Sequence, residues 1–357
     1  MLLPGTDPTM GAPAPAVPVQ QPAVGRQRPC IAGGCAEPAV PAARLAEAIT
    51  PGDVERLRPL LPVGYPAGVR AYQAAAAGLT ADDLSEHYTR GLAWFHDEFA
   101  PRLRATIAAL TGGAWDLSRH RAFAAGSDVD MMAHVVDAVA QAGRVTLYPG
   151  DWFGFRVGSA RPDAIAWSAA GGGLACLCVP SVRNGHVTEE MAAFLEGGEA
   201  ALLNLNLLPT LTADERCAVA GRLAPIVPRA LLSISFSRGF GLTASQLGVL
   251  LAPEDHPLVR RFETQWNWFT YFYNAIAARA FLALDLAELA AVDGARRAWV
   301  RRWLSERGLP ALDTGSYYVR AFRTEGAVAD HLAPLCRDGV VRLCCKPPAD
   351  PRDAGSR

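Results

Sequence analysis

The chain has 357 residues, 50% of them hydrophobic, and a formal net charge of -1. These values allow a large core in one big domain with a smaller lobe, or in two domains, and give no reason to expect a nucleic-acid or membrane-surface partner. No apolar run approaches the ~20 residues that span a bilayer, and the N-terminus lacks the regions of a signal peptide, so we expect a cytoplasmic protein.

The first part of the chain is predicted to be an arm without a core. Residues 1–40 are rich in Pro, Ala and Gly, and such a segment cannot bury enough surface to offset its ordering entropy. Helical patterns begin near Ala42, and we assign 41–78 to the N-terminal part of a small lobe. Thr80 and Asp83 have the spacing of a capping box, at the start of one or two long helices that reach Leu110.

After Gly112-Gly113 the pattern changes to short apolar runs that alternate with amphipathic segments. Continuous apolar strands alternating with helices indicate a mostly parallel sheet covered on both faces. We assign the large α/β domain to 79–290 and a C-terminal part of the small lobe to 291–357. The predicted strands are 144–148, 173–179, 200–208, 230–235, 316–321 and 340–344, and the predicted helices are 129–142, 188–195, 212–223 and much of 256–290.

The counts of cysteine and lysine limit the chemistry that this chain can perform. The eight cysteines are spread thinly through a long chain, unlike a disulfide scaffold, so reduced thiols are the default. Cys30 and Cys35 lie close together in the arm, but no second ligand pair completes a metal site. Lys346 is the only lysine in the sequence. A mechanism that needs an internal lysine therefore has one candidate, near the C-terminus.

Several turn segments carry polar or aromatic residues in a suggestive order. Gly126-Ser127-Asp128 opens a predicted helix, whose terminal N–H groups could bind a phosphate or simply be capped. Trp152 follows a predicted strand. The run VPSVRNG contains Val182 and Gly185 and precedes another helix.

The most specific segment is SISFSRGFGLTASQLGVLLAP, residues 233–253. It contains Ser235, Ser237, Arg238 and Gln246. Arg342 lies on a late predicted strand, where it is either a surface residue or a carboxylate ligand.

In this order the segments resemble the fold type I pyridoxal-phosphate (PLP) enzymes, specifically the class I/II aminotransferases, over about residues 120–345. The resemblance implies an α/β fold, with a mostly parallel sheet of the seven-stranded type and a smaller α+β lobe, and a homodimer. It also implies site residues. Gly126, Ser127, Asp128, Ser235 and Ser237 would bind the cofactor phosphate, Trp152 would stack on the pyridine ring, Asn204 or Asn206 would face the ring nitrogen, and Arg342 would grip a substrate carboxylate.

The sequence departs from the family at the residues that hold the cofactor. Arg238 stands where the Schiff-base lysine is expected, asparagine replaces the aspartate that pairs with the pyridinium, Val182 replaces an asparagine, and Gln246 replaces a phosphate-binding arginine. An arginine stays protonated, so it can neither form the imine nor shuttle the proton, although it can bind phosphate or carboxylate. Lys346 lies beyond the expected site.

Three functions remain open. The first is a PLP-independent enzyme that acts on an amino-acid-like or carboxylated small molecule held by Arg238 and Arg342; by analogy, it would serve specialised metabolism. The second is an enzyme that binds PLP or pyridoxamine phosphate without a covalent bond. The third is a noncatalytic pseudoenzyme or partner subunit. His186 is a candidate general base or an exposed loop residue, and the aromatic run 265–273 is expected in the core, at a dimer interface or in a ligand pocket.

Overall fold

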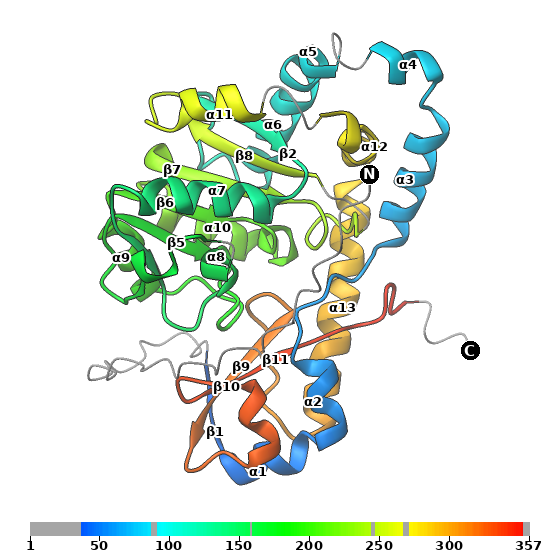
Figure 1. Cartoon of the computed structure of the whole chain (residues 1–357). Helices are drawn as coiled ribbons and strands as arrows, with labels where there is room; N and C mark the ends of the chain where they lie inside the picture. The colour runs from blue at the N-terminus through cyan, green and yellow to red at the C-terminus, as the bar shows by residue number, and fades with distance from the viewer. Residues whose placement is uncertain (1–36, 87–90, 158, 244–246, 267–270, 353–357) are drawn as a thin grey trace, which may run out of the picture. The chain divides into compact units, whose positions relative to one another are not determined.

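The structure is a computed structural model that describes residues 37–86, 91–157, 159–243, 247–266 and 271–352 (Figure 1). Its larger sheet has seven strands in the order β2-β8-β7-β6-β5-β3-β4. The predicted α/β fold is therefore confirmed. The strands are β2 (His120–Ala125), β3 (Val145–Leu147), β4 (Ile165–Trp167), β5 (Leu174–Cys178), β6 (Ala200–Asn204), β7 (Ala230–Ser235) and β8 (Gly248–Pro253).

The strands of this sheet are parallel except β8, which runs antiparallel to both β2 and β7. All residues of β5, β7 and β8 are buried, as expected for strands covered on both faces. The carboxyl ends of β5, β6 and β7 lie side by side at one edge of the sheet, because these strands are parallel neighbours. This edge positions the polar residues described below.

The helices of this part begin at residues that favour helix starts. Ser127 caps α7 (Asp128–Ala140), Thr188 caps α9 (Glu189–Glu196), and Thr212 forms a capping box with Glu215 at α10 (Ala213–Leu223). The other helices around the sheet are α3 (Pro66–Ala77), α4 (Ala81–Glu86), α5 (Leu92–Trp94), a π-helical turn (Phe95–Phe99), α6 (Ala100–Leu110), α8 (Gly154–Val157), α11 (Val259–Trp266) and α12 (Tyr271–Leu282).

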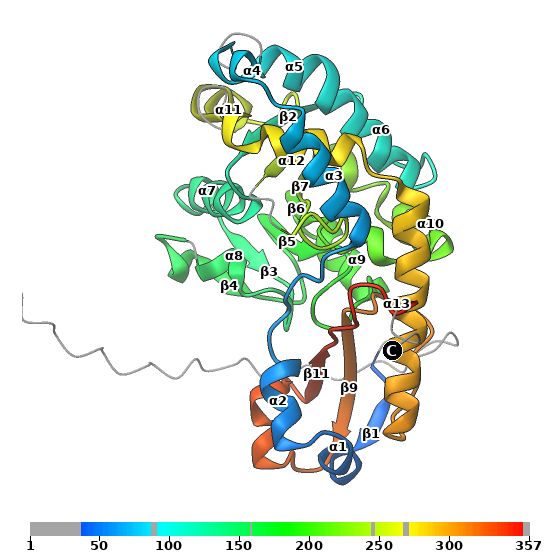
Figure 2. The ribbon, with the colours of Figure 1, turned by 90° about the vertical axis from the view of Figure 1, so that its right-hand side faces the viewer.

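A second sheet has four strands in the order β1-β9-β11-β10. It joins chain segments from near the two ends, since β1 pairs with β9 in parallel. The long helix α13 (Leu286–Glu306) lies beside β9 in Figure 2, and α2 lies near β11. The strands are β1 (Ala39–Pro41), β9 (Val319–Glu325), β10 (Cys336–Arg337) and β11 (Val340–Cys344), and the short helices here are α1 (Ala42–Ala48) and α2 (Pro51–Leu57).

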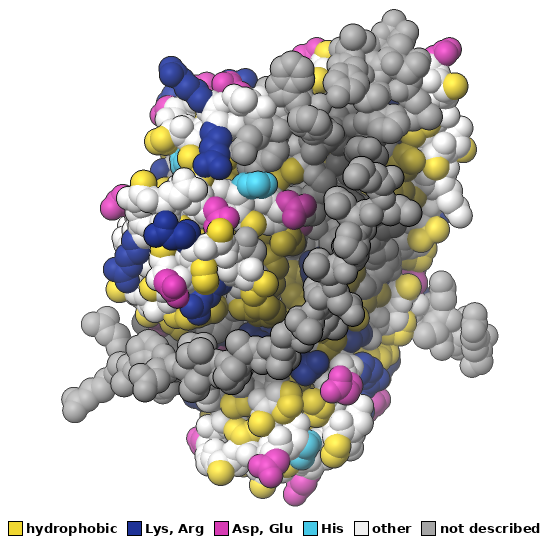
Figure 3. Space-filling model, in the orientation of Figure 1, with side chains coloured by type: hydrophobic (Ala, Val, Ile, Leu, Met, Phe, Trp, Pro, Cys, Tyr) yellow, Lys and Arg dark blue, Asp and Glu magenta, His cyan; other side chains and the backbone are white. Residues whose placement is uncertain are grey.

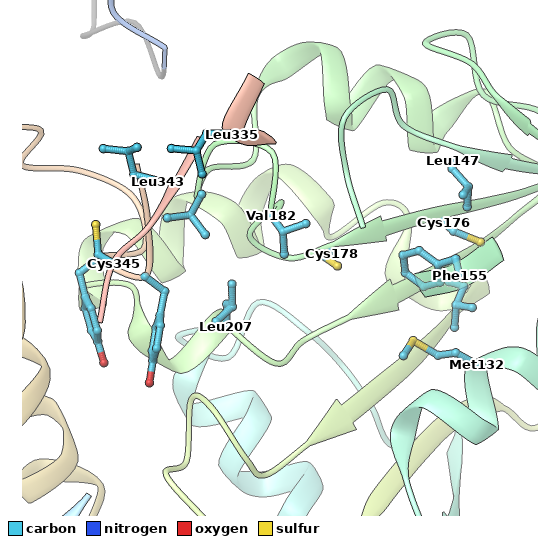
Figure 4. Close-up of a cluster of buried hydrophobic side chains, with 14 of the residues drawn as sticks. Met132, Leu147, Phe155, Cys176, Cys178, Val182, Leu207, Leu335, Leu343 and Cys345 are labelled. Atoms are coloured by element: carbon cyan, nitrogen blue, oxygen red, sulfur yellow. The ribbon is translucent and has the colours of Figure 1, made fainter. Parts of the chain in front are cut away.

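One hydrophobic cluster extends from the first sheet to the second. Figure 4 shows Val182, Cys178 and Leu207 between side chains of both sheets, with Met132 and Phe155 on one side. Leu335, Leu343 and Cys345 lie on the other. The two sheets therefore share a core, which fixes the turn after β5 against β11.

Several sequence expectations need correction. Strands β2, β4 and β8 were not predicted, because HRAFAA is alanine-rich, IAW is very short, and GVLLAP begins with glycine and ends with proline. The strand expected at 200–208 ends at Asn204, where the chain turns so that the Asn206 N–H donates to the Asn204 side chain. The strand expected at 316–321 begins at Val319.

Two further sequence expectations concern the N-terminal arm and the capping box at Thr80. The expected arm 1–40 is too long, because Glu37 is buried and β1 already begins at Ala39. The capping box of Thr80 and Asp83 is confirmed by reciprocal hydrogen bonds of 2.9 and 3.1 Å. Cys30, Cys35 and Gln246 lie outside the described residues. So do residues 267–270 of the aromatic run 265–273, and the side chains of the rest of that run are not described either. None of the described helices has both the length and the apolarity to cross a bilayer.

Candidate functional site

A chain of buried hydrogen bonds joins α7 to the ends of β6 and β7. The Asn206 side-chain amide donates to the Asp128 carboxylate at 3.0 Å, and its oxygen accepts from the Ser235 N–H at 2.7 Å. The Ser235 hydroxyl lies 2.9 Å from that of Ser237. Asn204 is the last residue of β6, and its side-chain amide donates to the sulfur of Met132 at 3.4 Å. The structure thus brings these predicted cofactor residues together.

The start of α7 lies close to β8, and this closeness fixes Asp128. A Cβ on Gly248 would come within 2.1 Å of the Asp128 backbone nitrogen, so only glycine fits there. The Ser127 side chain caps α7, since its hydroxyl accepts a hydrogen bond from the Asp130 N–H at 3.1 Å. Gly126 precedes Ser127, and a Cβ on Gly126 would meet no atom within 4 Å. The predicted Gly-Ser-Asp turn is therefore a helix cap with a buried acid behind it.

The Asp128 carboxyl is buried, and burial raises its pKa. The hydrogen bond from Asn206 and the positive charge of Arg238 both act in the opposite direction. Arg238 therefore lies within electrostatic reach of Asp128. The pair combines an acid that holds its proton more readily than usual with a permanent cation.

Arg238 itself is held by the segment that precedes α3. Its Nη2 donates to the Leu60 carbonyl oxygen at 3.0 Å, and its Nε is buried without an acceptor among the described residues. The same segment contacts Gly241, three residues after Arg238, since a Cβ there would come within 1.9 Å of the Tyr65 ring. A guanidinium with an unused buried donor is suited to bind an anion.

A second cluster of cations surrounds β11. The charges of Arg342, Lys346, Arg337 and Arg238 all act to lower the pKa of Cys344, although burial is the larger effect and raises it. Arg342 donates to the Val182 carbonyl oxygen at 3.3 Å. The pKa of Arg337 is lowered by burial and by the charge of Arg342. Within the described ranges, none of these four cations forms an ion pair. Asp338, whose charge acts on Arg337, lies 4.0 Å from Arg183.

The turn after β5 is built on a buried acid that the sequence did not single out. Asp151 accepts hydrogen bonds from the Cys178 N–H at 2.7 Å, the Ser181 hydroxyl at 2.7 Å and the Val182 N–H at 2.9 Å. Burial raises its pKa to about 6. The Val179–Pro180 peptide in this turn is cis. Asp151 therefore fixes the position of Val182 and, through it, the acceptor of Arg342.

Trp152 follows Asp151 directly. Its ring lies edge-on to Phe155 at 5.2 Å between centroids, and a Cβ on Gly154 would collide with it. The indole therefore folds over the start of α8, and it is partly buried against the shared core. No described contact links it to Ser235, Ser237 or Asn206, so stacking on a ligand ring stays a prediction.

His186 lies in a different environment from Arg238. Its Nε2 is buried without a described partner, and a Cβ on Gly315 would come within 2.5 Å of it. Burial lowers its pKa to about 4, and the charge of Arg320 is the next cause. Its other charged neighbours are Glu215, Arg297 and Glu37, and none of them belongs to the clusters above. The structure therefore does not bring His186 to Arg238.

The donor set can be tested against covalently held PLP. An imine needs an amine, and the side chain beside Asp128 is the guanidinium of Arg238. Asn204 donates to a methionine sulfur and carries no charge with which to hold a pyridinium. Lys346 lines a surface pocket with Trp299 and Trp303 instead. The basic side chain beside Asp128 therefore offers no amine for an imine.

No protein-family model matches the chain, and no curated protein matches it. Solved structures match its fold. The aromatic aminotransferase from Pyrococcus horikoshii OT3 is 15% identical, with 83% of this chain and 93% of that one covered and a TM-score of 0.55. The histidinol-phosphate aminotransferase from Sinorhizobium meliloti, in complex with pyridoxal-5'-phosphate, is 16% identical, with coverage of 87% and 93% and a TM-score of 0.51.

A third similar structure is the PLP-bound C-S lyase from Staphylococcus hominis, with 10% identity, coverage of 85% and 90% and a TM-score of 0.54. At such identities the likeness shows the fold alone. The match extends over most of both chains in each case. The chain is an aminotransferase-fold protein.

Proposed function

We propose that this chain is an enzyme on an aminotransferase scaffold that acts without an internal aldimine, and without PLP, on an amino-acid-like or other carboxylated small molecule. One observation carries the proposal. The charges of Arg238, Arg337 and Arg342 all act on the buried thiol of Cys344, and none of the three forms an ion pair among the described residues. Arg238 and Arg342 are partly buried, and a partly buried cation without an ion-pair partner favours the binding of an anion. Figure 3, in the orientation of Figure 1, shows hydrophobic side chains near the middle of the visible face and Lys and Arg side chains below them.

The residues divide the work according to their chemistry. Arg342, held by Val182, and Arg238, with its unused Nε donor, bind the anionic groups of the substrate. Asp128 is the acid beside Arg238, and burial raises its pKa, so it holds a proton more readily than an exposed aspartate and is our candidate proton carrier. His186 has no part in this proposal. A role in specialised biosynthesis would fit such a changed site, by analogy alone.

A homodimer belongs to the same proposal. Phe153, which directly precedes α8, and Val157 at the end of α8 are 47% and 71% exposed, and Val129 of the neighbouring α7 is 43% exposed. Large exposed apolar side chains that lie close together favour a protein contact. A second copy covering them would also shield the approach to the Arg337 guanidinium, which lies over the Phe153 ring at 5.5 Å.

The first prediction concerns the binding of a simple probe. L-glutamate, followed by isothermal titration calorimetry at low salt, is expected to bind saturably. Arg342→Gln should weaken this binding at least about tenfold, because a charge-assisted pair contributes roughly 1.5–3 kcal/mol. Arg301→Gln is the matched control, since Arg301 is 55% exposed and pairs with Asp313. If all three proteins bind glutamate equally, or if the wild type binds neither glutamate nor related dicarboxylates, the result would count against the proposal.

A noncovalent PLP site is the second candidate, because the adjacent hydroxyls of Ser235 and Ser237 could bind a phosphate. The second prediction separates the two. We expect no saturable change in visible absorbance when PLP is titrated into the Lys346→Ala protein, which lacks the only lysine. Arg238→Lys is expected to stay colourless as well, because Asn204 cannot stabilise the pyridinium. A saturable change that Trp152→Ala abolishes would replace our proposal with noncovalent PLP use.

A further inference from the structure

Arg320 of β9 is a buried cation with almost no partners. The residue is 1% exposed. Its Nη1 donates to the Thr314 carbonyl oxygen at 2.7 Å, and its Nε is buried without an acceptor in the described part of the chain. A buried guanidinium normally needs a carboxylate or several acceptors, because burial removes the water that would otherwise solvate its charge.

The charged groups around Arg320 do not supply that partner. Glu215 is the nearest acid by its effect, but its carboxylate already binds Arg297 at 3.4 Å and the Gly315 N–H at 2.5 Å. Asp313 points to Arg301 at 3.1 Å and is 71% exposed. Burial raises the pKa of Cys345 to about 12, so that thiol is neutral. One positive charge therefore stays uncompensated.

A second unused donor lies close by. His186 Nε2 is buried and has no described partner, and Arg320 is the charge that most strongly affects this ring. The two residues come from segments that touch, since the Ser316 N–H donates to the Gly185 carbonyl oxygen at 2.8 Å. An Nε2–H on His186 and the Nε–H of Arg320 together form a donor pair without an acceptor.

We propose that a monovalent inorganic anion, chloride under ordinary conditions, binds at Arg320 Nε–H and His186 Nε2–H. Chloride fits because it accepts from several donors at once and because the enclosure of Arg320 disfavours a bulky ligand. The anion links the turn after β5 to the start of β9. Since the same turn carries Val182, which holds Arg342, anion binding also stabilises the position of Arg342. This site is separate from the one proposed for the substrate.

The test replaces potassium gluconate by potassium chloride at constant ionic strength and follows thermal unfolding of the full chain. The midpoint should rise by about 2 °C when chloride exceeds its dissociation constant about tenfold. Arg320→Gln should lose this rise, and Arg301→Gln, whose side chain is exposed on α13, should keep it. An equal rise in the Arg320→Gln protein, or no rise in the wild type, would overturn the proposal.

A second measurement does not depend on a variant that folds. Crystals of the wild type soaked in bromide are expected to show an anomalous peak within hydrogen-bonding reach of Arg320 Nε and His186 Nε2. A water molecule at that position, with no anomalous signal, would show that solvent satisfies these donors and would refute anion binding.

Discussion

Replacing Asp151 with alanine is expected to lower the free energy of unfolding by about 3–5 kcal/mol, the range for breaking a buried charged network. The substitution leaves the N–H groups of Cys178 and Val182 and the hydroxyl of Ser181 without their acceptor. These groups are buried, so water cannot replace the carboxylate at no cost. Urea unfolding at pH 7, followed by circular dichroism, measures the effect.

Asp137 offers a matched control for this substitution. Its carboxylate also accepts from a serine hydroxyl and a backbone N–H, those of Ser159 and Ala160, at 2.5 and 2.9 Å. It lies on α7 in a more exposed setting, so Asp137→Ala should cost about 1 kcal/mol or less. If both alanine variants lose the same stability, the turn after β5 is not held by Asp151 as described.

The fold was accessible from the sequence because its signals are local. The continuous apolar runs of β5, β7 and β11 and the capping residues at α9 and α10 mark these elements without tertiary information. Strands β2 and β8 are different. They are buried, but alanine in one and terminal glycine and proline in the other give weak propensities, so neighbouring strands decide their conformation.

The candidate site was only partly accessible, because it depends on contacts between distant segments. Ser235 and Asn206 follow neighbouring strands, and their meeting follows from a parallel sheet. Asp151 looked like an ordinary turn residue after Pro149-Gly150, and its three partners lie 27 to 31 positions later. The approach of Arg337 to Arg342 required the pairing of β10 with β11. No local pattern signals such meetings.

The pH dependence of stability gives a test of the environment of His186. Burial and Arg320 lower its pKa to about 4 in the folded chain, from 6.5 when unfolded. The unfolded chain therefore binds a proton first as the pH falls. The stability that comes from keeping His186 neutral is complete above pH 6.5 and is lost between pH 6.5 and about 4. The raised pKa values of Asp151 and Asp293, about 6 for each, act in the opposite direction over this range.

A comparison of the wild type with His186→Gln isolates the histidine, because Asp151 and Asp293 titrate in both proteins and glutamine does not titrate. The wild type's stability relative to the variant is expected to fall by about 3 kcal/mol as the pH falls from 7 to 4, since one pKa unit corresponds to ~1.4 kcal/mol. Urea unfolding in gluconate buffers measures it, since chloride would oppose the effect of Arg320. A difference that stays constant across this range would mean that the ring is protonated or solvated in the folded chain, contrary to its burial beside Gly315.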